Sequence, residues 1–380
     1  MSTLVNNLTS GRSAIREFAG AAFWRLPGRF TIARALGPSY ALRCAVFHDI
    51  SLSDSPFTRG MGVSTSPDDF EAALKFLSQH YNPVSLAAVL SEAEGRALPP
   101  RAVLVTFDDG YASAMEFAEP LCRKFGVPAV FFLNAAYLDN QRLAPDNIVC
   151  FVANALGMET IRAAAHEVKA DFFKLSRLSD VFSRFFPAIS LSERQAFLDA
   201  LLRLSGIHEH DLAQEAKLYL TRRQVAGLAL RGFEIGNHTY THVRCRSMKA
   251  KDFVNEIGRN KTELEALAGR EVRSFSVPYG SAADLSPDLA AYLRGSGHRV
   301  AFLSESVANP RSAEPFWIDR VSVRADREHA LFLEVEVMPR LRAIRNRLFR
   351  AGRFVCASRA QAPSVMGVNV PDQAAGENQN

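Results

Sequence analysis

Short apolar runs that stop abruptly at polar residues recur along the chain. The sharpest covers residues 102–107 and ends in the adjacent carboxylates Asp108 and Asp109, which Gly110 follows. Runs of four to eight apolar and β-branched residues bounded by polar or turn residues are typical of buried strands. Comparable runs predict strands over residues 42–50, 127–133, 232–237, 274–277, 298–303 and 318–323. The pattern indicates a parallel α/β protein, in which chemistry collects where strands end.

Several segments between these runs follow a helical period. Ser66 caps a predicted helix that continues through His80 and buries one apolar face. From about residue 139 to about 220 the pattern becomes helical and rich in alanine, leucine and phenylalanine, which predicts a helical insertion packed on the barrel-like core. Residues 327–331 are interpreted as the start of a further helix.

Composition is that of a large soluble protein. The 380 residues are 48% hydrophobic and 22% charged, with a net charge of +5. Five cysteines are odd in number and form no CxxC pair, which favours a reducing compartment over a disulfide framework. The sequence shows neither a secretory signal nor a spanning run of about 18 to 20 apolar residues. We therefore expect a cytoplasmic protein, peripheral at the inner membrane face at most.

The carboxylates Asp108 and Asp109 need a compensating partner, because adjacent negative charges at a buried strand end repel each other. A second predicted strand ends at His238, and His242 follows four residues later. Two histidines and one carboxylate suit zinc, with cobalt, nickel, manganese or iron(II) as alternatives. Asp108 would then be free to act as a base. The alternative interpretation is that the histidines are surface or capping residues and the aspartates only begin a helix.

A third segment breaks into Pro278-Tyr279-Gly280. Proline fixes the backbone and glycine permits an unusual turn, so the N–H of Tyr279 is a candidate donor to a developing oxyanion. Taken alone, such a tripeptide is more often just a turn.

These three motifs in this order resemble the polysaccharide deacetylases, the NodB homology family, over roughly residues 42–330. That family includes chitooligosaccharide and poly-N-acetylglucosamine deacetylases. The resemblance implies a distorted (β/α) barrel of about seven strands and a divalent metal, usually zinc. Matched by motif position, the metal ligands would be Asp109, His238 and His242, and Asp108 would be the catalytic base.

The chain departs from the family pattern at two places. Many members carry an arginine two residues before the proline of the third motif, where this chain has Ser276. The late Leu-x-His motif, which supplies a general acid, is not visible. His48 ends the first predicted strand and is a candidate to replace it as the donor that protonates the leaving amine. The alternative is a histidine hydrogen-bonded at a strand end.

The expected organisation has four parts. Residues 1–40 form a basic amphipathic segment, residues 41–330 the barrel with its insertion at about 139–220, residues 331–356 a basic helix, and residues 357–380 a disordered tail. The two basic segments are expected to pack on the barrel, with contact to an anionic membrane surface as the alternative. Nucleic-acid binding is not expected, since no reading module accompanies the charge.

The function expected from these features is metal-dependent removal of N-acetyl groups from an N-acetylglucosamine-type oligo- or polysaccharide, with release of acetate, for instance during exopolysaccharide biosynthesis. Two alternatives stay open. The same centre could hydrolyse another C–N bond, such as a formamido sugar on a lipid carrier. The second alternative is a carbohydrate-binding protein without turnover, which Ser276 and the missing late motif suggest. The sequence leaves the oligomeric state open.

Overall fold

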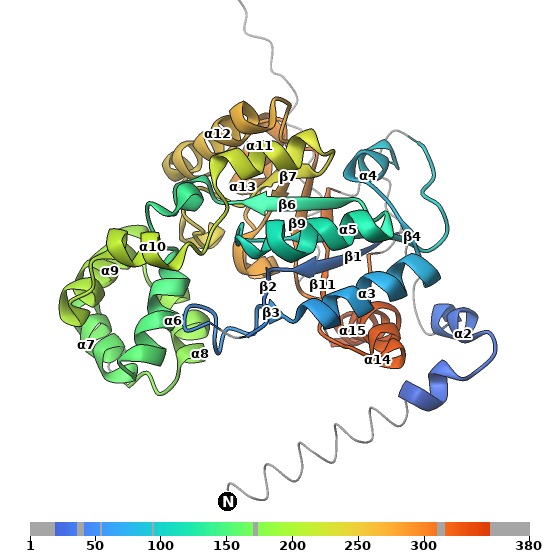
Figure 1. Cartoon of the computed structure of the whole chain (residues 1–380), viewed down its shortest axis with the longest axis horizontal. Coiled ribbons are helices and arrows are strands. Elements are labelled where there is room, and N and C mark those ends of the chain that lie inside the picture. The colour runs from blue at the N-terminus through green and yellow to red at the C-terminus, as the bar shows by residue number, and fades with distance from the viewer. Residues whose placement is uncertain are drawn as a thin grey trace, which may run out of the picture.

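The computed structural model describes residues 20–35, 42–53, 55–92, 95–169, 174–309 and 316–349. Within this part of the chain, nine parallel strands form one sheet that curls almost into a closed barrel (Figure 1). The spatial order is β10 (Trp317–Asp319), β9 (Val300–Leu303), β8 (Ser274–Ser276), β7 (Glu234–Asn237), β6 (Ala129–Leu133), β5 (Ala102–Phe107), β1 (Leu42–Phe47) and β11 (Val321–Ser322), while β4 (Asn82–Pro83) pairs with β5 off this path. A separate short pair joins β2 (Asp49–Ile50) to β3 (Ser64–Thr65). The predicted distorted (β/α) barrel is confirmed.

The barrel closes where the sequence pattern predicts one continuous strand over residues 318–323. That prediction is wrong in one respect, because the segment divides at Arg320. On one side of the break β10 pairs with β9, and on the other side β11 pairs with β1. The chain therefore changes from one edge of the sheet to the other at this residue, whose side chain is fully buried.

Helices surround the barrel (Figure 1). They are α3 (Pro67–His80), α4 (Leu86–Glu92), α5 (Glu119–Phe125), α11 (Arg222–Leu230), α12 (Arg259–Ala268), α13 (Pro287–Gly295), α14 (Glu328–Phe332) and α15 (Met338–Phe349). Ser66 is the N-cap of α3, as predicted, and its Oγ accepts the N–H of Asp69 at 3.1 Å. The segment after residue 327 is also helical, as expected.

Side chains alternate between the two faces of the sheet. Inward-facing residues such as Leu104, Phe132 and Phe302 share one buried cluster with α4. The residues between them, such as Val105 and Phe131, pack outward in a second cluster with α3 and α5. The period of two along each strand explains why the strands are apolar throughout, since both faces are covered.

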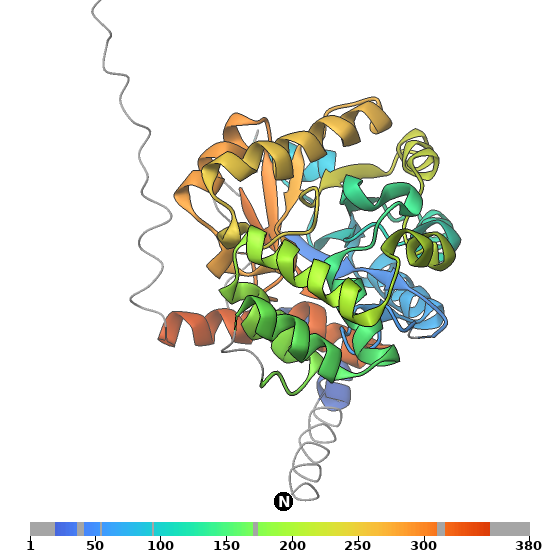
Figure 2. The ribbon, with the colours of Figure 1, turned by 90° about the vertical axis from the view of Figure 1, so that its left-hand side faces the viewer.

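Helices of the inserted segment form a lobe beside the barrel (Figures 1 and 2). They are α6 (Pro145–Ala155), α7 (Met158–Val168), α8 (Leu178–Asp180), α9 (Leu191–Ser205) and α10 (Glu209–Ala216). This inserted lobe has a buried core of its own, which includes Ile161, Phe185 and Phe197. In Figure 2, where the left-hand side of Figure 1 faces the viewer, these helices lie in front of the barrel. The lobe therefore stands at one end of the barrel.

The described parts of both basic terminal segments pack on the barrel's exterior. Before α2 (Arg29–Ala35), the ring of Trp24 lies 5.7 Å from that of Phe76 and 5.4 Å from that of Phe332. Near the C-terminus, Arg340 is buried and pairs with Glu336 at 2.7 Å, so this arginine does not face solvent. Four arginines of the two basic segments lie outside the described residues, namely Arg12, Arg16, Arg350 and Arg353. The predicted tail over residues 357–380 also lies outside them. In the part of the chain that the structure describes, no helix is both long enough and apolar enough to cross a membrane.

Candidate metal centre and active site

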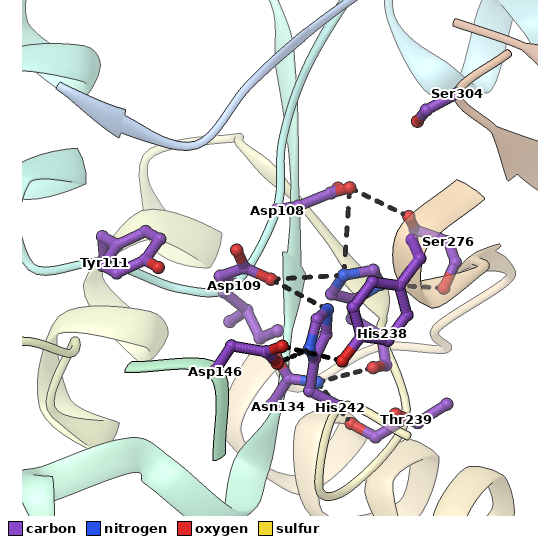
Figure 3. Close-up of polar contacts among 12 residues, drawn as sticks. Asp108, Asp109, Tyr111, Asn134, Asp146, His238, Thr239, His242, Ser276 and Ser304 are labelled. Carbon is purple, nitrogen blue, oxygen red and sulfur yellow. Dashed lines mark hydrogen bonds and ion pairs between the residues drawn. The ribbon is translucent and has the colours of Figure 1, made fainter. Parts of the chain in front are cut away.

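Polar side chains gather at the carboxyl ends of the barrel strands (Figure 3). Asp109 follows β5, and His238 follows β7. The Oδ1 atom of Asp109 lies 3.3 Å from Nε2 of His238 and 3.4 Å from Nε2 of His242. All three ligand atoms lie within 4.8 Å of one another. The structure therefore brings the three predicted ligands together on one point.

Hydrogen bonds orient both imidazole rings toward that point. Nδ1 of His238 lies 2.8 Å from the carbonyl oxygen of Ser276, and Nδ1 of His242 lies 2.8 Å from Oδ2 of Asp146. Each Nδ1–H donates to its oxygen, so each ring presents its Nε2 to Asp109. Outer partners of this kind fix the tautomer and the angle of metal-binding histidines.

The environment of Asp109 fits a cation. Its Oδ1 is buried and has no hydrogen-bond partner among the described residues. Burial would raise the pKa of this carboxyl, but His242, His238 and His48 together hold it below its usual range. An ionised, buried oxygen that accepts no hydrogen bond is unfavourable unless a cation binds it. Two imidazole nitrogens and one carboxylate oxygen are a donor set that suits zinc and related divalent ions.

The backbone around the three ligands is strained. Asp109, Thr239, His242 and Tyr279 all have positive φ, between 50° and 69°. Residues other than glycine rarely adopt this conformation, and where they do the surrounding structure must hold them there. Such outliers gather at active sites, and four of them surround this one.

Three buried asparagines hold the loop that carries the histidines. Asn134 donates Nδ2–H to the carbonyl of His238 at 2.5 Å and to that of Thr239 at 2.9 Å. Asn237 accepts the N–H of Thr239 at 3.0 Å, and Asn260 donates to Oδ1 of Asn237 at 2.7 Å. The side chains of this network come from the ends of β6 and β7 and from α12, so the loop is fixed by the barrel itself.

Asp108 is held by an arginine that sequence reasoning did not find. Arg320 donates Nη1–H to Oδ1 at 2.7 Å and Nη2–H to Oδ2 at 2.7 Å, a bidentate contact inside the barrel. Ser276 adds a hydrogen bond to Oδ2 at 3.2 Å and accepts from Arg320 at 2.8 Å. Burial raises the pKa of Asp108, but the Arg320 guanidinium, together with His238 and His48, brings it below its usual value and keeps the carboxyl ionised.

The family's missing arginine is thus replaced from another strand. Ser276 occupies the expected position in the third motif, while Arg320 reaches Asp108 from the break between β10 and β11. Its guanidinium carbon lies 5.5 Å from the ring centre of Phe132 and 5.9 Å from that of Phe302, which form the barrel interior beneath it. The one sequence signal was an arginine in the middle of a predicted strand.

His48 stands beside the same site. It follows β1, and its pKa responds to the charges of Asp109, Asp108 and His238. Burial, together with the charges of Arg320 and His238, lowers that pKa, although the two aspartates raise it. By contrast His329, in the helix predicted to start at residues 327–331, is on α14, which packs against α3 on the outside of the barrel.

Asp146 is the second residue that sequence reasoning missed. It begins the inserted lobe, on the first turn of α6, and is buried. Besides His242 it binds Tyr279, whose phenol O–H donates to Oδ1 at 2.8 Å. The ring of Tyr279 lies 4.9 Å from that of His242. The third motif and the inserted lobe therefore both contact the predicted metal ligand His242. No local pattern in the sequence predicts this contact.

Comparison with known proteins agrees with this geometry. Residues 95–297, slightly more than half of the chain, match the family model for polysaccharide deacetylase. The chain belongs to the polysaccharide deacetylase family. No curated protein matches it in sequence.

Solved structures share the fold at low identity. The deacetylase PplD of Streptococcus pyogenes, in complex with acetate, is 12% identical, with a TM-score of 0.52 over 79% of this chain and 99% of that one. IcaB of Ammonifex degensii is 18% identical, with a TM-score of 0.52 over 79% and 98%. A de-N-acetylase of Aggregatibacter actinomycetemcomitans is 16% identical, with a TM-score of 0.50 over 75% and 95%. At these identities the likeness concerns the fold alone.

Proposed function

We propose that this polysaccharide deacetylase family member is a metal-dependent hydrolase that removes N-acetyl groups from an N-acetylglucosamine-type oligo- or polysaccharide. The observation that carries the proposal is the convergence of Asp109, His238 and His242 beside an ionised Asp108. Two of the similar structures support acetate as the released acid, because one is described as an acetate complex and the other as a de-N-acetylase.

Each residue has a part in the proposed reaction. A divalent metal, most simply zinc, held by Asp109 and the two histidines would polarise the acyl carbonyl and favour attack by water. Asp108 accepts the proton of the attacking water, since its Oδ2 lies 3.8 Å from Nε2 of His238 and thus beside the ligand cluster. The backbone N–H of Tyr279 stabilises the oxyanion. Tyr279 has a φ of 62°, and this unusual backbone conformation sets the direction of its N–H.

His48 is the proposed proton donor to the leaving amine. It stands close enough to both aspartates for their charges to act on its pKa. The proton that Asp108 takes from the water would pass through the neutral His48 to the amine nitrogen as the C–N bond breaks. Acetate and a free amino sugar then leave the site.

A small pocket beside the ligands supports a short acyl group. A cavity of about 10 Å³ is lined by Asp109 and His242 and by the rings of Tyr111, Tyr137 and Tyr219. Space of this size holds about one water molecule, or one methyl group at most. The methyl end of an acetyl group or the hydrogen of a formyl group suits this space, whereas a longer acyl chain requires the tyrosines to move.

The test combines metal content with product analysis. Purified wild-type protein is expected to hold about one divalent metal per chain and to release acetate from N-acetylglucosamine oligomers, while His238→Ala loses both. His48→Ala is expected to keep the metal and lose most of the turnover. Metal without acetate would direct the search to other acylated sugars, such as formamido sugars. A wild-type protein that binds neither zinc nor cobalt would refute the proposal and favour sugar binding without turnover.

A further inference from the structure

A second pocket lies between the inserted lobe and the barrel, on the side of Tyr279 away from the metal ligands. Its walls include Phe186 and Arg194 from the lobe and Arg244, Ser247 and Tyr279 from the barrel. Tyr279 links it to the metal centre, because this ring lines the pocket and lies 4.9 Å from the ring of His242 and 4.1 Å from the Arg244 guanidinium. A group bound there is one side chain away from the reacting atoms.

The two arginines of this pocket are not fully satisfied by the protein. Arg244 pairs with Asp284 at 3.0 Å, whereas Arg194 donates to the carbonyl of Thr241 at 2.7 Å and has no carboxylate within ion-pair distance in the described part of the chain. The Nε atoms of both arginines are buried and lack hydrogen-bond partners there. The two buried N–H donors therefore belong to cationic side chains that line one small pocket.

Such donors favour an anionic ligand. A buried donor without an acceptor is costly, and hydrogen bonds between guanidinium groups and carboxylate or phosphate oxygens are the strong, charge-assisted kind. The open space inside the pocket, about 10 Å³, admits one oxygen atom of such a group. Tyr279 and Phe186 provide aromatic walls beside it, which suit the apolar face of a sugar.

We propose that this arginine pocket, formed by Arg194, Arg244, Ser247 and Tyr279, binds an oxyanion carried by the substrate. The substrate class is then an acidic acylated amino sugar, in which a carboxylate on a neighbouring sugar or a phosphate on the same sugar enters the pocket. This inference rests on the proposed function, since it assigns the substrate of the same active site.

The test compares binding of three N-acetylglucosamine compounds by calorimetry. They are a neutral tetramer, a tetrasaccharide alternating with glucuronate, and the uridine diphosphate sugar. Asp108→Asn protein is used so that nothing is hydrolysed, and metal-free wild-type protein replaces it if that variant does not fold. At least one anionic compound is expected to bind about tenfold or more tightly than the neutral tetramer, and the one that does identifies the source of the oxyanion.

Two variants and one control link the preference to the pocket. Arg194→Gln is expected to reduce the ratio of anionic to neutral binding about tenfold. Ser247→Asp, which supplies the pocket with its own carboxylate, is expected to abolish the ratio without removing an arginine. Arg203→Gln is the matched control, because Arg203 lies on the same helix but pairs with Glu167 on the surface.

Equal binding of all three compounds to the unsubstituted pocket would overturn the proposal, as would equal effects of Arg194→Gln and Arg203→Gln. Because binding is measured without hydrolysis, these outcomes are separate from a failure of the proposed function. That failure would appear as an absence of metal or acetate in the wild-type protein.

Discussion

At the scale of the residue, the contact between Arg320 and Asp108 decides what the carboxylate can do. Both side chains are buried, and a charge buried without a partner would neutralise itself by a shift in its pKa. The two parallel hydrogen bonds keep Asp108 ionised and fix its plane, so that it can accept a proton. Lysine cannot reproduce this geometry, because a single ammonium offers no planar pair of donors.

We therefore expect Arg320→Lys to fold and to lower turnover about tenfold to a hundredfold. The acid limb of the pH–rate profile should move to higher pH, because one of the contacts that hold the pKa of Asp108 down is weakened. Arg294→Lys, an exposed change on α13, serves as the control. An acid limb that stays in place would mean that Arg320 only supports the fold.

At the scale of the element, the inserted lobe is joined to the metal centre by the first turn of α6. Asp146 fixes His242 from that helix, and Asn147 donates to the backbone of Phe57 at 3.0 Å, which ties the same turn to the loop after β2. The lobe thus contributes to the barrel's chemistry, and its core also includes Phe57 and Tyr111 from loops of the barrel. For the metal centre, the position of the lobe therefore matters as much as the packing inside it.

Asp146→Asn should weaken metal binding about tenfold to a hundredfold while the folded state is kept, because the asparagine can still accept the Nδ1–H of His242 but carries no charge. Competition with a chromophoric chelator measures this affinity without reference to activity. Asp199→Asn, on the exposed side of α9 where Asp199 binds Gln195, is the control. Equal affinities in the two variants would show that the lobe does not assist the metal site.

Element boundaries show where sequence reasoning succeeded and where it failed. The strands β5, β6 and β7 follow from local apolar runs, because each is buried on both faces. The break at Arg320 does not follow, because it depends on which strands the two halves meet: β10 joins β9, whereas β11 joins β1. Pairing across the closure of a barrel is a non-local choice, and the six residues of this segment carry no sign of it.

At the scale of the whole molecule, stability depends on polar groups buried beneath the site. His298 is buried, and its neutral Nε2 accepts a hydrogen bond from Asn237 at 3.3 Å. Burial, followed by the charge of Lys261, lowers its pKa to about 4. The unfolded chain binds a proton at this residue near pH 6.5, whereas the folded chain does not until about pH 4. Its contribution to stability is therefore present above pH 6.5 and is lost as the pH falls toward 4.

Between pH 7.5 and pH 5, wild-type protein should lose about 2 kcal/mol more unfolding free energy than His298→Gln. Comparing the two proteins isolates this residue from Asp319, whose pKa burial raises to about 6 and which acts in the opposite direction. Urea denaturation at both pH values provides the measurement. Parallel losses in the two proteins would contradict the assignment.

The sequence by itself determined the α/β class, the family motifs, the three candidate ligands and Asp108. Each of these features is encoded in a short stretch of chain, in which a buried strand is followed by polar residues. Only the tertiary structure decided that Arg320 replaces the missing arginine, that Asp146 orients His242, and that Arg194 and Arg244 border one pocket. These contacts join residues 96 to 212 positions apart or meet at a seam between the barrel and the inserted lobe. Their energies depend on burial and mutual geometry, which exist only after the barrel has closed.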